Sequence, residues 1–219
     1  MIDHQHWHDR WREDRIGFHE SSVNPQLLKH FPSFVLPKAA RIFVPLCGKT
    51  LDLIWLADQG YQVLGIELSK IALEAFFAEQ GREYTCSETD RFRIYHSGNL
   101  TLLEGDFFDL CADDLRGCVM TYDRASLIAL ETADRLAYYQ QMRSILPPDS
   151  DMLLMTLEYD QTEMRGPPFA VLESEVRNHY QEDFVIEVLE RNQVIDERPR
   201  WRKVGLSAID EVVLRLDRR

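Results

Sequence analysis

The stretch that decides the fold is RIFVPLCGKTLDLIWLADQGYQVLGIELS, residues 41–69. An apolar run at 41–46 predicts a first strand, and the near-continuous apolar run at 61–67 predicts a second strand that is buried on both faces. Between them, the spacing of apolar residues predicts a helix from Thr50 to Gln59. A strand, a helix and a strand in this order predict a βαβ unit on a largely parallel sheet.

The turn after the first strand contains Gly-Lys-Thr at 48–50, which is the end of a phosphate-binding loop. Such a loop needs a glycine five positions before Gly48, but Phe43 stands there, and Pro45 lacks an amide that the cradle would use. A dinucleotide GxGxxG motif is also absent. The turn is therefore either an ordinary strand-to-helix connection or the site of a ligand without bound pyrophosphate.

Two acidic residues favour a ribose-bearing ligand. Glu67 ends the second strand, 67 − 48 = 19 residues after Gly48, close to the offset of about 20 at which an acid meets ribose hydroxyls in doubly wound folds. The alternative for Glu67 is a solvated strand end. Asp106 follows a strand predicted at 100–104 and precedes Phe107, where such folds place an adenine.

The remaining sequence continues the alternation of strands and helices. A hairpin is predicted to turn at 97–99, and the other predicted elements are a helix after Ser69, strands at 118–124 and 152–159, a helix at 132–146 and closing strands within 184–191 and 205–216. Residues 1–40 do not fit this alternation. They hold too many aromatic residues for a disordered tail, and we interpret them as a helical lid over the sheet.

Composition limits the functions that are open to the chain. It has 219 residues, 45% of them hydrophobic, which suits one domain, and a formal net charge of −12, which disfavours nucleic acid and anionic membranes as partners. The four cysteines lack the spacing of a disulfide framework or metal site, and His4, His6 and His8 are expected on a solvated surface. The N-terminus has no apolar signal segment, so we expect a cytoplasmic protein that acts on a small molecule.

Four separated blocks carry a family resemblance: WHDRWREDRIGFHE at 7–20, FVPLCGKTLDLIWLADQGYQVLGIELS at 43–69, YDRASLIAL at 122–130 and GPPFAV at 166–171. The sequence resembles the thiopurine S-methyltransferase family, of the bacterial type. The resemblance implies an α/β fold of the class I S-adenosylmethionine-dependent methyltransferases, Rossmann-like and doubly wound, with helices on both faces of a seven-stranded sheet that has one antiparallel strand. Residues 1–219 would form a single domain, in which 1–40 are the lid and 41–219 the cofactor-binding core.

The family's activity is methyl transfer from S-adenosylmethionine to an aromatic or heterocyclic thiol, leaving S-adenosylhomocysteine, and some relatives are associated with selenium and tellurium species. The cofactor contacts that the resemblance implies are Trp7, Trp11, Phe18, Leu46, Glu67, Asp106, Phe107 and Arg124. On the acceptor side it implies Phe18 and Arg198.

Methyl transfer from a sulfonium is an in-line displacement that needs alignment and exclusion of water, so we expect neither a general base nor a metal. Aromatic faces attract a sulfonium, although Trp7, Trp11 and Phe18 could instead be core residues. Arg124 or Arg198 could stabilise an acceptor thiolate, and Arg124 could alternatively form a structural ion pair. We expect a monomer, and the alternative function is a protein that binds S-adenosylmethionine or S-adenosylhomocysteine without catalysis.

Overall fold

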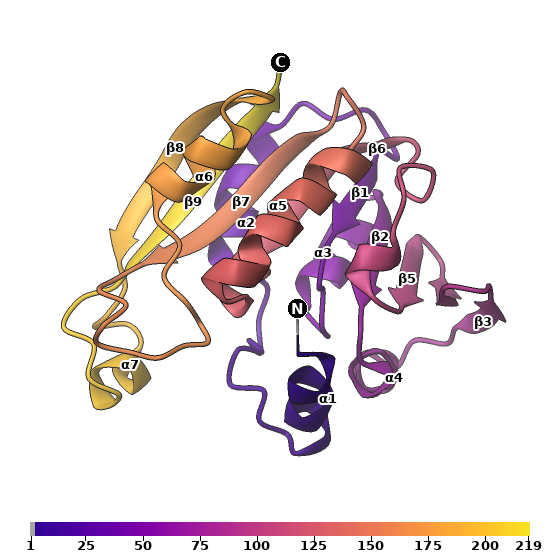
Figure 1. Ribbon diagram of the computed structural model, residues 1–219. Coiled ribbons are helices and arrows are strands. Elements are labelled where there is room, and N and C mark those ends of the chain that lie inside the picture. Colours follow the sequence, from indigo (N-terminus) through magenta and orange to yellow (C-terminus); the bar gives the residue numbers. More distant parts are fainter. Residues whose placement is uncertain (1–2) are drawn as a thin grey trace. The chain divides into compact units, whose positions relative to one another are not determined.

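The structure, a computed structural model, describes residues 3–219 and divides them into two compact units (Figure 1). The parallel unit comprises residues 3–122 and 145–147, and the antiparallel unit comprises residues 123–144 and 148–219. Each unit has its own buried residues and its own part of the predicted site. That the whole chain is a single domain remains a prediction.

The parallel unit is built on strands in the order β3-β4-β5-β2-β1-β6. Strand β1 pairs in parallel with both β2 and β6, β2 pairs in parallel with β5, and the antiparallel strands β3 and β4 extend the sheet beyond β5. The bounds are β1 Arg41–Val44, β2 Gln62–Glu67, β3 Thr85–Glu88, β4 Arg93–Ser97, β5 Leu100–Glu104 and β6 Cys118–Arg124. The predicted βαβ unit and the predicted hairpin between β4 and β5 are both confirmed.

The helices of the parallel unit begin where side chains can accept the first free amides. Asn24 accepts from the amide of Gln26 at 2.8 Å, and Ser69 accepts from the amide of Ala72 at 3.4 Å. The helices are α1 His4–Arg12, α2 Pro25–His30, α3 Asp52–Asp58 and α4 Lys70–Glu79, with short 3₁₀ turns η1 Phe31–Ser33 and η2 Phe107–Asp109. Helix α1 contacts α4, as Figure 1 shows, so the aromatic N-terminal segment covers part of this unit.

The antiparallel unit holds the strands β7 Asp151–Glu158, β9 Asp210–Arg218 and β8 Phe184–Gln193, in the order β7-β9-β8. Both pairings are antiparallel. The helices of this half of the chain are α5 Thr132–Ile145, α6 Glu173–Tyr180 and α7 Pro199–Lys203, and the 3₁₀ turn η3 is Leu127–Ala129. Helix α7 lies in the connection between β8 and β9, which the sequence analysis left without structure.

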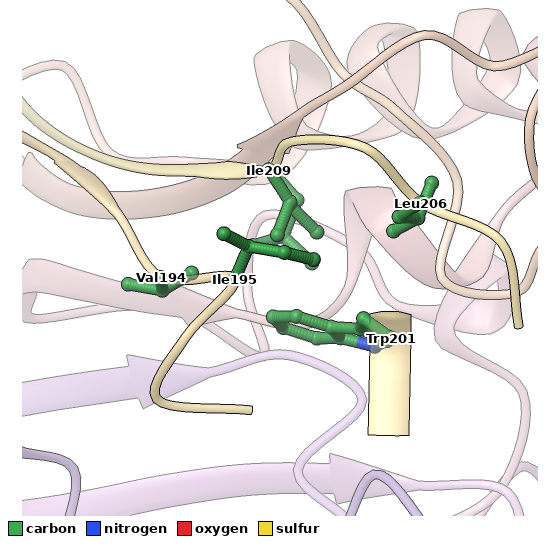
Figure 2. Packing of buried hydrophobic residues seen from close by; sticks show 6 residues of the cluster. Val194, Ile195, Trp201, Leu206 and Ile209 are labelled. Atoms are coloured by element: carbon green, nitrogen blue, oxygen red, sulfur yellow. The ribbon is translucent and has the colours of Figure 1, made fainter. Parts of the chain in front are cut away.

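A separate hydrophobic cluster fixes that connection (Figure 2). Trp201 of α7 packs among Leu157 at the end of β7, Val194 and Ile195 after β8, and Leu206 and Ile209 before β9. Trp201 is 6% exposed. Burial of a large aromatic side chain supplies most of the stabilisation that a five-residue helix cannot supply itself.

The expected α/β class with a mostly parallel sheet is confirmed, but the number of strands is not seven. Within residues 3–219 there are nine strands, because β3 and β4 add a hairpin beyond the strands of the parallel core. Helix α3 begins at Asp52 rather than Thr50, whose hydroxyl accepts from the Asp52 amide at 3.3 Å. In the described residues, no helix is long and apolar enough to cross a membrane.

Candidate functional site

The turn after β1 is fastened to the end of β2 by its own amides. Leu46 and Gly48 both have positive φ angles, 45° and 53°, which curl the chain back toward β2. The Cys47 amide donates to the carbonyl of Ile66 at 2.9 Å, and the Gly48 amide donates to Oε2 of Glu67 at 2.9 Å. One amide thus binds a main-chain carbonyl and the other a carboxylate of the protein itself, so these two amides are not available to a phosphate.

Glu67 is a buried acceptor and not a solvated strand end. Its side chain is 7% exposed, and its Oε1 accepts from the Ser69 amide at 2.8 Å. Burial raises the pKa of Glu67 to about 7, against the opposing effect of hydrogen bonds from the backbone of Ser69, Gly48 and Leu68. Three backbone groups thus engage the carboxylate, whose two oxygens have about four acceptor positions, so it keeps some capacity to accept from a ligand.

Close approach of β2 to the turn requires glycine at position 65. A Cβ atom there would lie 2.7 Å from Cδ2 of Leu102 and 2.9 Å from Sγ of Cys47. Cys47 is itself buried, and burial together with the charge of Glu67 raises its thiol pKa well above the usual value. The thiol therefore packs beneath the turn and is not an activated nucleophile.

The predicted aromatic residues of the N-terminal segment lie together beside this turn. The rings of Trp11 and Phe18 meet edge to face with centroids 5.6 Å apart, and those of Trp7 and Phe18 with centroids 5.9 Å apart. Trp11 is 6% exposed, and a Cβ at Gly48 would come within 3.4 Å of its ring. The structure thus joins Trp7, Phe18 and Trp11 in a row that ends on the turn.

Arg10 stacks on two rings of this row. Its guanidinium carbon lies 5.7 Å from the ring centroid of Trp7 and 5.6 Å from that of Phe18, within the range of cation–π attraction. The sequence analysis missed this residue. The signal was its position one helical turn after Trp7, since residues three apart on a helix are neighbours.

The predicted adenine-side segment lies at the same end of the sheet. The Gly105 amide donates to the carbonyl of Glu67 at 3.0 Å, which holds the loop after β5 against the end of β2. Asp106 accepts from the Phe108 amide at 2.9 Å through Oδ1, while its Oδ2 lies 3.2 Å from Nε2 of His4. Phe107 is buried.

His4, which was expected on a solvated surface, is 42% exposed, and it also pairs with Asp106 and so ties the start of α1 to this loop. Among the described residues, no cluster of three or more His, Cys, Asp and Glu side chains could hold a metal ion.

The two predicted arginines belong to the antiparallel unit. Arg124 is half-buried at the end of β6, between the fully buried Asp123 and Ala125, whose φ is 67°. Arg198 precedes α7, and its guanidinium carbon lies 5.1 Å from the ring centroid of Trp201, while that of Arg200 lies 5.4 Å from the same ring.

The structure therefore groups the predicted site residues into two sets. Seven of the nine lie in the parallel unit and are linked by the contacts above: Trp7, Trp11, Phe18, Leu46, Glu67, Asp106 and Phe107. Arg124 and Arg198 lie in the antiparallel unit.

Comparison with known proteins gives consistent results. The family model "Thiopurine S-methyltransferase (TPMT)" matches residues 2–219. A thiopurine S-methyltransferase of Pseudomonas paraeruginosa is 47% identical over 212 residues, covering 97% of both chains, and one of Bordetella petrii is 43% identical over 217 residues, covering 99% of both.

Solved structures agree on the fold. A SAM-dependent methyltransferase of Anabaena variabilis has a TM-score of 0.66 at 13% identity and covers 100% of this chain and 96% of its own. The 1,6-didemethyltoxoflavin-N1-methyltransferase of Burkholderia thailandensis, solved with S-adenosylhomocysteine bound, has a TM-score of 0.62 at 14% identity and covers 98% and 86%.

Proposed function

Because the chain belongs to the thiopurine S-methyltransferase family, we propose that it transfers a methyl group from S-adenosylmethionine to the sulfur of aromatic and heterocyclic thiols. The observation that carries the proposal is the environment of Glu67. A buried carboxylate held by the amides of Gly48 and Ser69 at the end of β2 still has capacity to accept from a ribose hydroxyl, and it lies at the offset from the turn at which doubly wound folds bind a ribose.

The residues around Glu67 fit an adenosyl group. The amides of Cys47 and Gly48 are used within the protein, so they cannot bind a pyrophosphate. Phe107 supplies a buried apolar face beside Asp106, whose carboxylate can accept from the exocyclic amine of an adenine. Leu46 at the head of the turn and Trp11 beside Gly48 would close the pocket.

The cofactor supplies an electrophilic methyl group on a sulfonium, and the protein residues align the reactants. Glu67 would fix the ribose, while Trp7, Trp11 and Phe18 would exclude water from the reacting atoms. We assign Arg124 to the cofactor carboxylate, for which a guanidinium fork is suited, and Arg198 to the acceptor. A heteroaromatic thiol ionises near neutral pH, so no general base is needed.

The test is transfer of a labelled methyl group from S-adenosylmethionine to a panel of thiols that includes thiophenol and 6-mercaptopurine, with selenide as a further acceptor. We expect the label in the methylated thiol and stoichiometric S-adenosylhomocysteine. Tight binding of S-adenosylhomocysteine without transfer to any acceptor would instead establish a non-catalytic binding protein.

We further propose that the protein acts as a cytoplasmic monomer on small-molecule thiols. The formal net charge of −12 supports this choice of partner, because it repels polyanions such as nucleic acid. Light scattering after size-exclusion chromatography should give the mass of one chain, and a dimer mass would contradict the monomer.

A further inference from the structure

The guanidinium of Arg10 is held in an unusual setting. It rests on the rings of Trp7 and Phe18, and its Nε is buried with no hydrogen-bond partner among the described residues. A buried donor without a partner destabilises the folded protein, and more so when the group is charged. Such a group is stabilised when an acceptor, above all an anionic one, takes the open position.

The charged groups near Arg10 also favour binding of an anion by its guanidinium. The influences on the Arg10 pKa are burial and the positive charge of Arg15, and both lower it. Carboxylates of the same segment are engaged with other residues: Asp9 accepts from Arg12 at 2.5 Å, and Glu13 accepts from Arg15 at 2.6 Å. Neither of these two carboxylates is paired with Arg10.

The position of Arg10 relates it to the proposed cofactor site. Its partner ring Phe18 contacts Trp11, and Trp11 lies against the turn whose Gly48 amide holds Glu67. An anion bound at Arg10 would therefore be separated from the turn that would hold the adenosyl group only by the rings of Phe18 and Trp11. The aromatic walls suit a flat apolar ring that carries this anion.

We propose that Arg10 binds the anionic sulfur of the acceptor and stabilises it as the thiolate, with Trp7 and Phe18 contacting the ring of the acceptor. This inference rests on the proposed methyltransferase function and adds to it the residue that selects the ionised thiol. The thiol proton is lost to solvent when the thiolate binds. In the transfer, a bond forms between the thiolate sulfur and the methyl carbon, the bond from that carbon to the sulfonium breaks, and a neutral thioether and S-adenosylhomocysteine result.

The first experiment compares variants across para-substituted thiophenols, from the nitro compound to the less acidic methoxy compound. Arg10→Met keeps an unbranched apolar stem on the rings but removes the charge. At a pH below the solution pKa of the methoxy compound and above that of the nitro compound, we expect its kcat/KM to fall about 10-fold or more with the methoxy compound and about 3-fold or less with the nitro compound, because only the methoxy compound needs the charge to become ionised. Arg10→Lys should recover part of the loss, since it restores the charge without the fork.

The matched control is Arg12→Met, on the same helix. Arg12 pairs with Asp9 and does not stack on the rings, so this variant should stay within about twofold of the parent for every thiophenol. An equal loss of kcat/KM with all thiophenols in Arg10→Met, or no loss, would overturn the inference. If the unaltered protein methylates no thiol at all, the proposed function itself fails.

A second measurement does not need turnover. 4-Nitrophenol is an oxygen analogue of the thiophenol acceptors, and its visible absorbance reports whether it is ionised. With S-adenosylhomocysteine present, the unaltered protein and Arg12→Met should lower the pKa of bound 4-nitrophenol, and Arg10→Met should not. An identical pKa of the bound phenol in all three proteins would contradict the role of Arg10, whatever the stability of the variants.

Discussion

Each unit of the molecule buries a carboxylate at the end of a parallel-paired strand, and the two are held differently. Glu67 on β2 accepts from the amides of Gly48 and Ser69, whereas Asp123 on β6 accepts from the hydroxyl of Tyr138 at 2.7 Å. Burial raises both pKa values, to about 7 for Glu67 and about 6 for Asp123. Glu67 is 7% exposed and Asp123 is 0% exposed.

These different environments suit Glu67 to binding a ligand and Asp123 to a structural role. The main chain of two loops fixes Glu67, so its remaining acceptor positions can face a ligand without depending on any neighbouring side chain. Asp123 is fully buried and accepts from the Tyr138 side chain of α5 and from Ser126, so it holds the turn after β6, where Ala125 has a φ of 67°. We therefore expect Glu67 to govern cofactor affinity and Asp123 to govern stability.

The largest effect should come from removing Glu67. Glu67→Ala should weaken binding of S-adenosylhomocysteine by more than about 10-fold, or about 1.4 kcal/mol, because the hydrogen bonding of the ribose hydroxyls to the carboxylate is lost. Isothermal titration calorimetry measures the affinity. The control is Glu104→Gln, since Glu104 lies opposite Glu67 on β5 but accepts from Tyr95 at 2.6 Å; it should change the affinity less than about threefold.

Asp123→Asn tests whether Asp123 contributes to stability and not to cofactor binding. It should lower the melting temperature while leaving the affinity for S-adenosylhomocysteine within about threefold, since Asn can still accept from Tyr138. A loss of affinity as large as that of Glu67→Ala would remove the distinction between the two carboxylates.

The stability of the protein without ligand should depend on pH through the buried carboxylate of Glu67. The folded-state pKa of Glu67 lies above its ordinary value of 4.5, at about 7, so the folded protein binds more protons between these values. The free energy of unfolding without ligand should therefore fall as pH rises from 5 to 7, by an amount on the order of 2 kcal/mol. Urea denaturation across this range measures it.

Ligand affinity should have the opposite slope. A ribose needs the ionised acceptor, so the affinity for S-adenosylhomocysteine should fall as pH drops below 7, approaching about 10-fold per pH unit. Glu67→Gln should flatten both profiles near pH 7. A binding profile that keeps its slope in this variant would show that another group titrates.

The aromatic row tests how far the site depends on the N-terminal segment. Trp11→Ala should weaken S-adenosylhomocysteine about 5- to 10-fold, because Trp11 is buried against the turn at Gly48. Trp7→Ala removes a half-buried ring at the far end of the row and should have a smaller effect. Fluorescence titration with both variants measures this, and the reverse ranking would contradict the order of contacts.

Sequence alone predicts the part of this site that is local. The apolar runs and the turn between them fix β1, α3 and β2, and the 19-residue offset from Gly48 identifies Glu67. The amide contacts that bury Glu67 could not be predicted in detail, because they depend on the positive φ of Leu46 and Gly48. A leucine with that conformation has no sequence signal.

The contacts that the sequence did not predict join distant or irregular segments. His4 and Asp106 lie on α1 and after β5, and only the folded chain brings them together. Helix α7 has five residues and forms because Trp201 is buried by residues before and after it, so periodicity could not reveal it. The hairpin strand β3 is exposed along its length and lacks an apolar pattern.

Removing Arg198 should weaken acceptor binding less than removing Trp11 weakens binding of S-adenosylhomocysteine. Arg198→Met should raise the KM for a thiol about fivefold and leave the KM for S-adenosylmethionine unchanged, because one charge-assisted hydrogen bond is lost. The control is Arg202→Met in α7, which removes an exposed ion pair with Asp196. A change in the KM for S-adenosylmethionine with Arg198→Met would show that Arg198 contacts the cofactor and not the acceptor.

The smallest effect should come from His4. Its contact with Asp106 is partly exposed, at 42% and 26% of the two side chains, and exposed ion pairs contribute about 0–1 kcal/mol. His4→Ala should therefore speed the dissociation of S-adenosylhomocysteine only about twofold, by freeing the start of α1 from the loop after β5. Stopped-flow displacement measures this rate, with His8→Ala on the same helix as the control. Equal rates in both variants would mean that Trp11, and not His4, is what holds the N-terminal segment over the turn.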